Sequence, residues 1–290
     1  MDTAELLKKI RKIEIKTRGL SSQVFSGEYH SAFKGRGMAF SEVREYNAGD
    51  DIRTIDWNVT ARFNHPFIKV FEEERELNVM LIVDVSASEN FGTNKQLKKE
   101  LITEICAVLA FSAIQNNDKT GVILFSDKIE KFIPPKKGKS HILRIIRELI
   151  TYKPESKKTD ISQAMRYFSN VIKKRSIAFV ISDFLDKDFT DAMKIANKKH
   201  DIVAIRTSDK HEQSLPNIGL AQMKDNETGE IKWIDTSSSL VQKKFANEHK
   251  KFEAWINETF NRCGIDAVSI KTGEPYIIPL MNLFKMREAR

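Results

Sequence analysis

A run of apolar residues, Val79–Val83, ends directly at Asp84, and a second run, Ile177–Ile181, ends at Ser182 and Asp183. Both runs are short, rich in β-branched residues and free of charge, which is typical of strands buried on both faces of a parallel sheet. Helix-like segments separate them, and strands that alternate with helices indicate a doubly wound, mostly parallel α/β fold. The carboxyl ends of such strands are where ligand sites gather.

The rest of the chain extends this alternation of helices and strands. A segment of turn-forming residues, Asp225–Glu230, lies between two alternating runs and predicts a β-hairpin at 219–235. The last long helix is expected to bury Leu240, Phe245, Phe252, Ile256 and Phe260, with Gly264 as its C-cap. We expect helices at 3–15, 95–116, 140–150, 160–174, 189–198 and 239–262, and further strands at 67–74, 121–125, 129–133, 201–206 and 265–270, the one at 129–133 being an edge strand closed by Pro134-Pro135.

This pattern divides the chain into two expected parts. Residues 1–75 form an irregular N-terminal segment, which is punctuated by glycines between Gly19 and Gly49. Residues 76–290 form the α/β domain, with the hairpin inserted at about 211–236.

The composition limits the classes of protein that the chain can belong to. The net charge is +8, but the lysines are spread along the chain in small groups, so a solvated surface is favoured over a nucleic-acid site. Cys106 and Cys263 lie in apolar surroundings and are expected to be reduced core residues. The first residues do not resemble a signal peptide, and no apolar run reaches the roughly 18 residues of a membrane span. We therefore expect a cytoplasmic protein.

Three oxygen-bearing side chains follow the first apolar run at alternate positions. Asp84, Ser86 and Ser88 point to the same side if the chain stays extended. Carboxylate and hydroxyl oxygens are hard ligands that suit Mg²⁺, with Mn²⁺ as an alternative. A purely structural alternative is that Asp84 caps a helix and the serines make turn hydrogen bonds.

Two later features strengthen the metal interpretation. Thr159-Asp160 stands just before a predicted helix, and Asp183 stands at the end of the second buried strand. Together with Asp84, Ser86 and Ser88 they resemble the metal-ion-dependent adhesion site of von Willebrand factor A domains. The resemblance implies that Ser86, Ser88 and Thr159 coordinate Mg²⁺, that Asp84 and Asp183 hold coordinated waters, and that a partner's acidic residue completes the site. This chain departs from the family pattern at Lys157-Lys158 and at Phe184, where glycines are usual.

The N-terminal part carries a second resemblance. Its residues are similar to the signature of the prokaryotic family called domain of unknown function fifty-eight, in which a von Willebrand A-like domain follows. Members of this family often occur beside MoxR-type ATPases of the AAA+ class, so the resemblance implies such a partner. The matching positions are Gly35, Gly37, Glu42, Arg44, Tyr46, Gly49-Asp50-Asp51, Asp56-Trp57, Thr60-Ala61-Arg62, Glu74-Arg75 and Glu227-Thr228-Gly229-Glu230.

These resemblances imply a non-enzymatic adaptor that binds another protein through Mg²⁺ in a chaperone or assembly system. Two alternatives stay open: a phosphohydrolase that holds Mg²⁺ between Asp84 and Asp183, and a basic nucleic-acid-binding module. The charges around Trp57 are expected to form an internal ion-pair network, with a docking surface as the alternative.

Overall fold

The structure is a computed structural model that describes residues 8, 10–17, 39–72, 76–90, 97–186, 188–209, 212, 216–224 and 231–288. Its contacts divide the chain into a small unit, Lys34–Leu77, and a large unit that joins Met1–Phe33 with Asn78–Arg290. The helix at 10–17, grouped above with the N-terminal segment, packs on the large unit. Its Ile10 is buried, and the Lys16 ammonium lies 2.6 Å from Glu104 Oε2.

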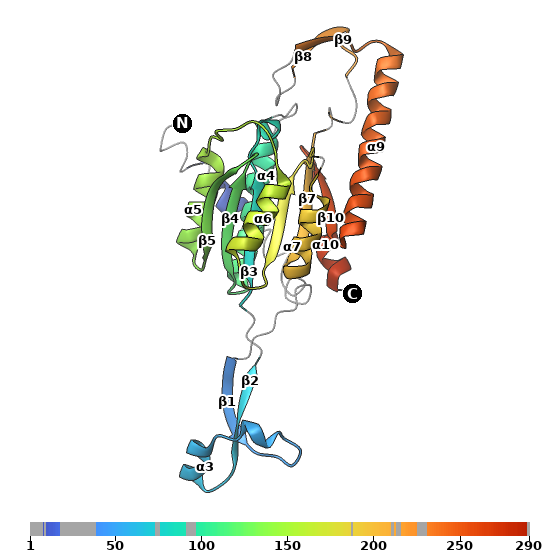
Figure 1. Ribbon diagram of the computed structural model, residues 1–290. Helices are drawn as coiled ribbons and strands as arrows, with labels where there is room; N and C mark the ends of the chain where they lie inside the picture. The colour runs from blue at the N-terminus through green and yellow to red at the C-terminus, as the bar shows by residue number, and fades with distance from the viewer. Residues whose placement is uncertain are drawn as a thin grey trace. The chain divides into compact units, whose positions relative to one another are not determined.

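A six-stranded sheet forms the centre of the large unit, in the order β10-β7-β6-β3-β4-β5 (Figure 1). Neighbouring strands are parallel except at one edge, where β5 runs antiparallel to β4. The predicted α/β fold is confirmed, including the edge strand. That strand was predicted to end before Pro134-Pro135, but it runs through both prolines to Lys136. The strands are β3 (Asn78–Asp84), β4 (Lys119–Phe125), β5 (Ile129–Lys136), β6 (Ile177–Ser182), β7 (Asp201–Ser208) and β10 (Asp266–Lys271).

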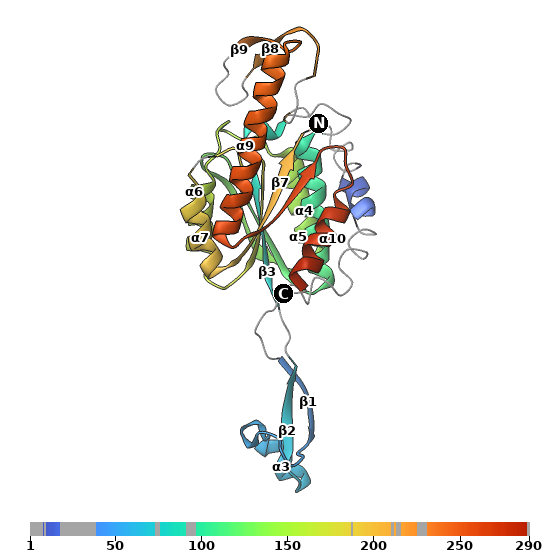
Figure 2. The ribbon, with the colours of Figure 1, turned by 90° about the vertical axis from the view of Figure 1, so that its right-hand side faces the viewer.

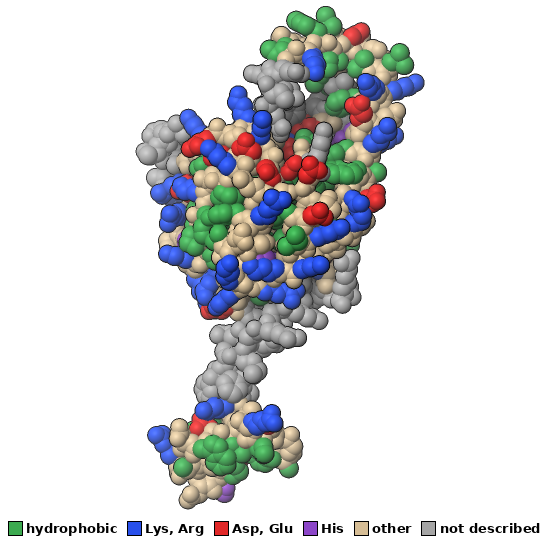
Figure 3. Space-filling view, viewed as in Figure 1, with side chains coloured by type: hydrophobic (Ala, Val, Ile, Leu, Met, Phe, Trp, Pro, Cys, Tyr) green, Lys and Arg blue, Asp and Glu red, His purple; other side chains and the backbone are tan. Residues whose placement is uncertain are grey.

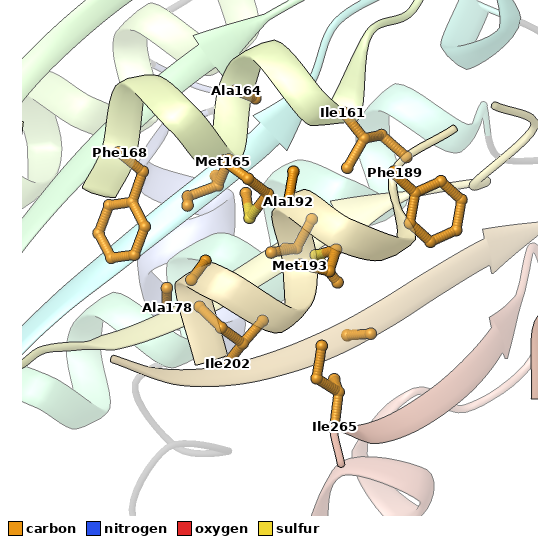
Figure 4. Packing of buried hydrophobic residues seen from close by; sticks show 14 of the residues in the cluster. Ile161, Ala164, Met165, Phe168, Ala178, Phe189, Ala192, Met193, Ile202 and Ile265 are labelled. Atoms are coloured by element: carbon orange, nitrogen blue, oxygen red, sulfur yellow. The ribbon is translucent and has the colours of Figure 1, made fainter. Parts of the chain in front are cut away.

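Helices cover both faces of this sheet (Figure 2). One face carries α4 (Lys98–Gln115), α5 (Lys139–Thr151) and α10 (Ile277–Glu288), and the other carries α6 (Ile161–Val171), α7 (Thr190–Lys199) and α9 (Ser239–Cys263). The apolar faces of α6 and α7 interlock over β6 and β7, as Met165, Phe168 and Met193 show (Figure 4). Both cysteines are free and buried, as predicted.

An antiparallel hairpin of β8 (Leu220–Lys224) and β9 (Ile231–Asp235) lies between β7 and α9, as predicted. Its expected turn, Asp225–Glu230, lies outside the described residues. The prediction for α9 is right for Ile256 and Phe260, which are buried, and wrong for Leu240, which is 77% exposed. The reason is that the first half of α9 extends beyond the edge of the sheet, where no strand lies beneath it (Figure 1).

The small unit contains two antiparallel strands, β1 (Ala39–Glu45) and β2 (Phe67–Glu72), a 3₁₀ helix η1 (Ile52–Thr54) and helix α3 (Trp57–Phe63). Asp51 and Asp56 cap these two helices by accepting hydrogen bonds from backbone N–H groups. Arg44 makes a two-pronged ion pair with Asp50, at 2.8 and 2.9 Å. Asp56 also pairs with the Lys69 ammonium at 3.4 Å, so the signature's carboxylates act both as helix caps and as partners in local ion pairs within this unit.

The tryptophan of that signature is not part of a core. Trp57 is 70% exposed, and Ile52 and Phe63 are 66% and 63% exposed. Among the described side chains of the unit, Ile68 is the one buried apolar residue. A unit of this size usually needs a further source of stability, because its own core is too small.

None of the helices within the described ranges is long and apolar enough to cross a membrane.

Candidate functional site

Three loops meet at the carboxyl edge of the sheet. They contain four of the five predicted site residues, and the fifth, Asp84, is the last residue of β3. The loop after β3 is joined to the loop before α6, because the Ala87 N–H donates to the Lys157 carbonyl at 3.2 Å. The loop after β6 is joined to the same helix, because the Ile161 N–H donates to the Asp186 carboxylate at 2.8 Å. Asp160 is the N-cap of α6, as its place before the predicted helix suggested.

Asp84 lies at the centre of this edge and is 1% exposed. Its Oδ1 accepts a hydrogen bond from the Ser86 N–H at 2.9 Å, and its Oδ2 accepts one from the Ser182 hydroxyl at 2.7 Å. Burial raises the pKa of the Asp84 carboxyl, and the negative charge of Asp183 raises it further. A buried carboxylate with a second carboxylate nearby creates a place where positive charge is stabilised.

Three side-chain hydroxyls lie at the same edge of the sheet as Asp84. The turn hydrogen bond from the Ser86 N–H and a hydrogen bond between the Ser86 and Ser88 hydroxyls at 3.0 Å both belong to the structural alternative. The same short separation would also let the two Oγ atoms bind one cation from the same side. Thr159 Oγ1 is buried and has no hydrogen-bond partner in the described structure, which is costly unless another group binds it. The hydroxyls therefore fit an oxygen-ligated cation such as Mg²⁺.

This arrangement differs from an ordinary carboxylate or histidine metal centre. Over the ranges that the structure describes, no group of three or more His, Cys, Asp and Glu side chains is placed to hold a metal ion. A cation at this edge would depend on the serine and threonine hydroxyls, with Asp84 and Asp183 acting through water. Figure 3 shows acidic side chains gathered in the upper part of the large unit, towards this edge, whereas Lys and Arg are more frequent below.

Asp183 has partners that the sequence analysis missed. Its Oδ2 lies 3.2 Å from the ammonium of Lys98, which is completely buried and also pairs with Glu212. Lys98 is the first residue of α4, and Glu212 lies between β7 and β8. Lysine is unfavourable at the start of a helix because of the helix dipole, and that position was the available signal.

Phe184 occupies the position where related sites usually have glycine. Its φ is +59°, in the left-handed region that glycine favours. The side chain is fully buried and packs against Phe189 and Phe260, at ring distances of 5.8 and 5.0 Å. Packing of the ring therefore compensates for backbone strain of about 1–2 kcal/mol.

Replacement of Phe184 separates these two effects. Phe184→Ala is expected to lower the free energy of unfolding by about 3–5 kcal/mol, because a buried ring is lost. Phe184→Gly is expected to be more stable than Phe184→Ala by about 1 kcal/mol, since it alone relieves the strained φ. Urea unfolding of the three proteins measures both differences, and a glycine variant less stable than the alanine variant would contradict the strain.

Comparisons with known proteins identify the relatives of this chain. The family model described as "Protein of unknown function DUF58" matches residues 42–254. The chain belongs to the DUF58 family. The matched range of this DUF58 protein includes both the N-terminal signature from Glu42 onward and all five predicted site residues.

Relatives of this DUF58 protein include uncharacterised proteins of two bacterial genera. Mb1516 of Mycobacterium bovis is 26% identical over 290 residues, covering 99% of this chain and 91% of its own length. YeaD of Bacillus subtilis is 20% identical and covers 63% of this chain and 44% of its own length.

Two solved structures are similar to the DUF58 protein in part. BatB from Bacteroides thetaiotaomicron has a TM-score of 0.48 and 14% identity, covering 74% of this chain and 100% of its own. The SpRpn10 VWA domain has a TM-score of 0.37 and 12% identity, covering 73% and 95%. The chain's sheet is doubly wound and mostly parallel with one antiparallel edge strand, as the sequence predicted.

Proposed function

We propose that this DUF58 protein is a non-enzymatic protein-interaction module whose strand-end site binds Mg²⁺ and, through it, an acidic residue of a partner protein. The observation that carries the proposal is the buried Thr159 hydroxyl, which has no hydrogen-bond partner in the described structure, at the edge where Ser86 and Ser88 bring their hydroxyls together. Nearby, the buried Asp84 carboxyl has a raised pKa, which a bound divalent cation would lower again.

Each side chain has a distinct part in this proposal. Ser86, Ser88 and Thr159 would bind the cation directly through their hydroxyls, and Asp84 and Asp183 would accept hydrogen bonds from its waters. Few direct carboxylate ligands leave the cation with most of its positive charge, and Mg²⁺ readily keeps several waters. When bound, the cation would supply an electrophilic position that a carboxylate from another protein can occupy.

For the partner, we propose an AAA+ ATPase of the MoxR type. The support is the family resemblance of the N-terminal signature, since such ATPases often occur beside family members. The proposed partner supplies an exposed Asp or Glu to the strand-end site.

Partner binding is expected to require both Mg²⁺ and Asp84. Tagged wild-type protein should retain the ATPase in Mg²⁺ and lose it in EDTA, and Asp84→Asn should lose it in both. Asparagine is chosen because it keeps an acceptor for the Ser86 N–H and the same volume in a fully buried position. Co-purification from the native host, followed by mass spectrometry, measures the retained partner.

Trp233→Ala is the matched control. Trp233 is 65% exposed on the β8–β9 hairpin, so its loss should leave the fold and the Mg²⁺ dependence unchanged. Retention of the ATPase by Asp84→Asn, or in EDTA, would contradict the metal-bridged interaction. Loss on Trp233→Ala alone would place the interface on the hairpin. Turnover of a phosphoester that disappears in Asp183→Asn would contradict the non-enzymatic role.

A further inference from the structure

The strongest unexplained feature of the molecule is a buried ammonium beside the candidate site. Lys98 is 0% exposed, and its Nζ contacts Asp183 at 3.2 Å and also Glu212. A lysine in such a place is strongly disfavoured, both by desolvation and by the positive end of the helix that it begins. The two carboxylates stabilise its charge, so the three groups form one ion cluster.

Glu212 is held in place by its other oxygen. Its Oε2 accepts a hydrogen bond from the Asp209 N–H at 3.0 Å, at the end of β7. The Asp209 carboxylate in turn accepts a hydrogen bond from the Thr272 hydroxyl at 2.5 Å, at the end of β10. Glu212 therefore contributes a carboxylate that is held in place beside Lys98.

We propose that Lys98 and Glu212 tune the divalent-cation affinity of the strand-end site in opposite directions. This inference rests on the proposed Mg²⁺ site. The Lys98 ammonium competes with the divalent cation for Asp183, because both are positive charges that the same carboxylate stabilises. Glu212 offsets part of the ammonium's charge, so it weakens that competition. Both are positioning residues that act on the cation through Asp183.

If Lys98 competes with the divalent cation and Glu212 weakens that competition, then removing the charge of each residue should change the Mg²⁺ affinity in opposite directions. Lys98→Met is expected to bind Mg²⁺ about tenfold more tightly than wild type, and Glu212→Gln about tenfold more weakly, each equal to about 1.4 kcal/mol. Isothermal titration calorimetry with MgCl₂ on the full chain, at one pH and ionic strength, measures both affinities. A purely structural role for the cluster would weaken Mg²⁺ binding in both variants.

Two further variants keep the test decisive. Lys131→Met is the control: Lys131 lies on β5, and its ammonium pairs with Glu148 of α5 at 2.7 Å. Its loss should leave the Mg²⁺ affinity unchanged. If Lys98→Met does not fold, the double variant Lys98→Met/Glu212→Gln is compared with Glu212→Gln, because the two differ at Lys98 alone. The double variant should bind Mg²⁺ more tightly than Glu212→Gln.

The outcomes separate this inference from the proposed function. If wild type binds Mg²⁺ and Lys98→Met binds it equally or more weakly, the competition is wrong and the metal site stands. If no variant binds Mg²⁺ and wild type does not, both the metal site and the competition are wrong.

Discussion

Gly121→Ala is expected to lower the free energy of unfolding by about 3 kcal/mol or more, a large share of the roughly 5–15 kcal/mol of a typical domain. Gly121 lies in β4, and a Cβ atom there would stand 2.8 Å from Met80 Sδ, 2.9 Å from the Ile133 carbonyl oxygen and 2.9 Å from the Pro135 nitrogen. Two of these atoms are backbone, so the collision cannot be relieved by a rotamer change.

The local pairing of the strands explains this close approach. The β4–β5 register shifts between Thr120 and Val122, opposite Pro134-Pro135, so the edge strand presses its backbone onto Gly121. Gly264→Ala is the control, because its φ of +63° imposes a strain of about 1–2 kcal/mol while its Cβ would meet its nearest atom at 3.8 Å. Chemical denaturation of both variants measures the difference, and an equal or smaller loss for Gly121→Ala would contradict the steric argument.

Acidification below pH 6.5 is expected to destabilise the protein by roughly 3 kcal/mol through His200 alone. His200 is 1% exposed, and in the described structure neither ring nitrogen has a hydrogen-bond partner. Burial, with a smaller contribution from the Lys199 and Arg175 charges, lowers the pKa of His200 to about 4. The unfolded chain therefore takes up the proton first, so stability is complete above pH 6.5 and falls until about pH 4.

His200→Phe tests this contribution because the ring keeps its contact with Phe168, whose centroid lies 4.3 Å away. Urea unfolding of both proteins at several pH values between 7 and 4 cancels the titration of all other groups. The stability difference between variant and wild type should shift by roughly 3 kcal/mol in favour of the variant as the pH falls. Parallel pH profiles would show that His200 does not take up its proton on unfolding.

The elements that the sequence predicted well are those whose burial can be inferred from the pattern of apolar residues within a single short segment. The runs at Val79 and Ile177 are apolar throughout because both faces of these strands are buried, and β3 and β6 lie side by side. The α10 helix, with Leu280, Leu283 and Phe284 buried, was missed. In α9, Leu240 occupies a position on the apolar face that the helical periodicity predicts, but it has no sheet beneath it and is exposed. The helical periodicity alone therefore did not determine which residues are buried.

The candidate site likewise contains residues that the sequence predicted and partners that only the structure revealed. Asp84 ends one strand, Ser86 and Ser88 come directly after it, and Asp160 caps the helix that it precedes, so their positions depend on a few consecutive residues. Lys98 and Asp183 are 85 residues apart, and the contact of Lys98 with Glu212 joins the start of α4 to the segment after β7. Neither residue stands in a pattern that marks a site, apart from the unfavourable place of Lys98 at the start of a helix.

The sequence alone determined the class of fold, the order of most of its strands and helices, and the strand end at which polar groups gather. These features depend on local burial and turn chemistry, which repeat along the chain with short periods. Only the tertiary structure decided that a buried lysine and a distant glutamate join Asp183, that Phe184 takes a glycine conformation, and that Trp57 and Trp233 stay exposed. Long-range packing places these groups, and packing between distant segments leaves no periodic trace in the sequence.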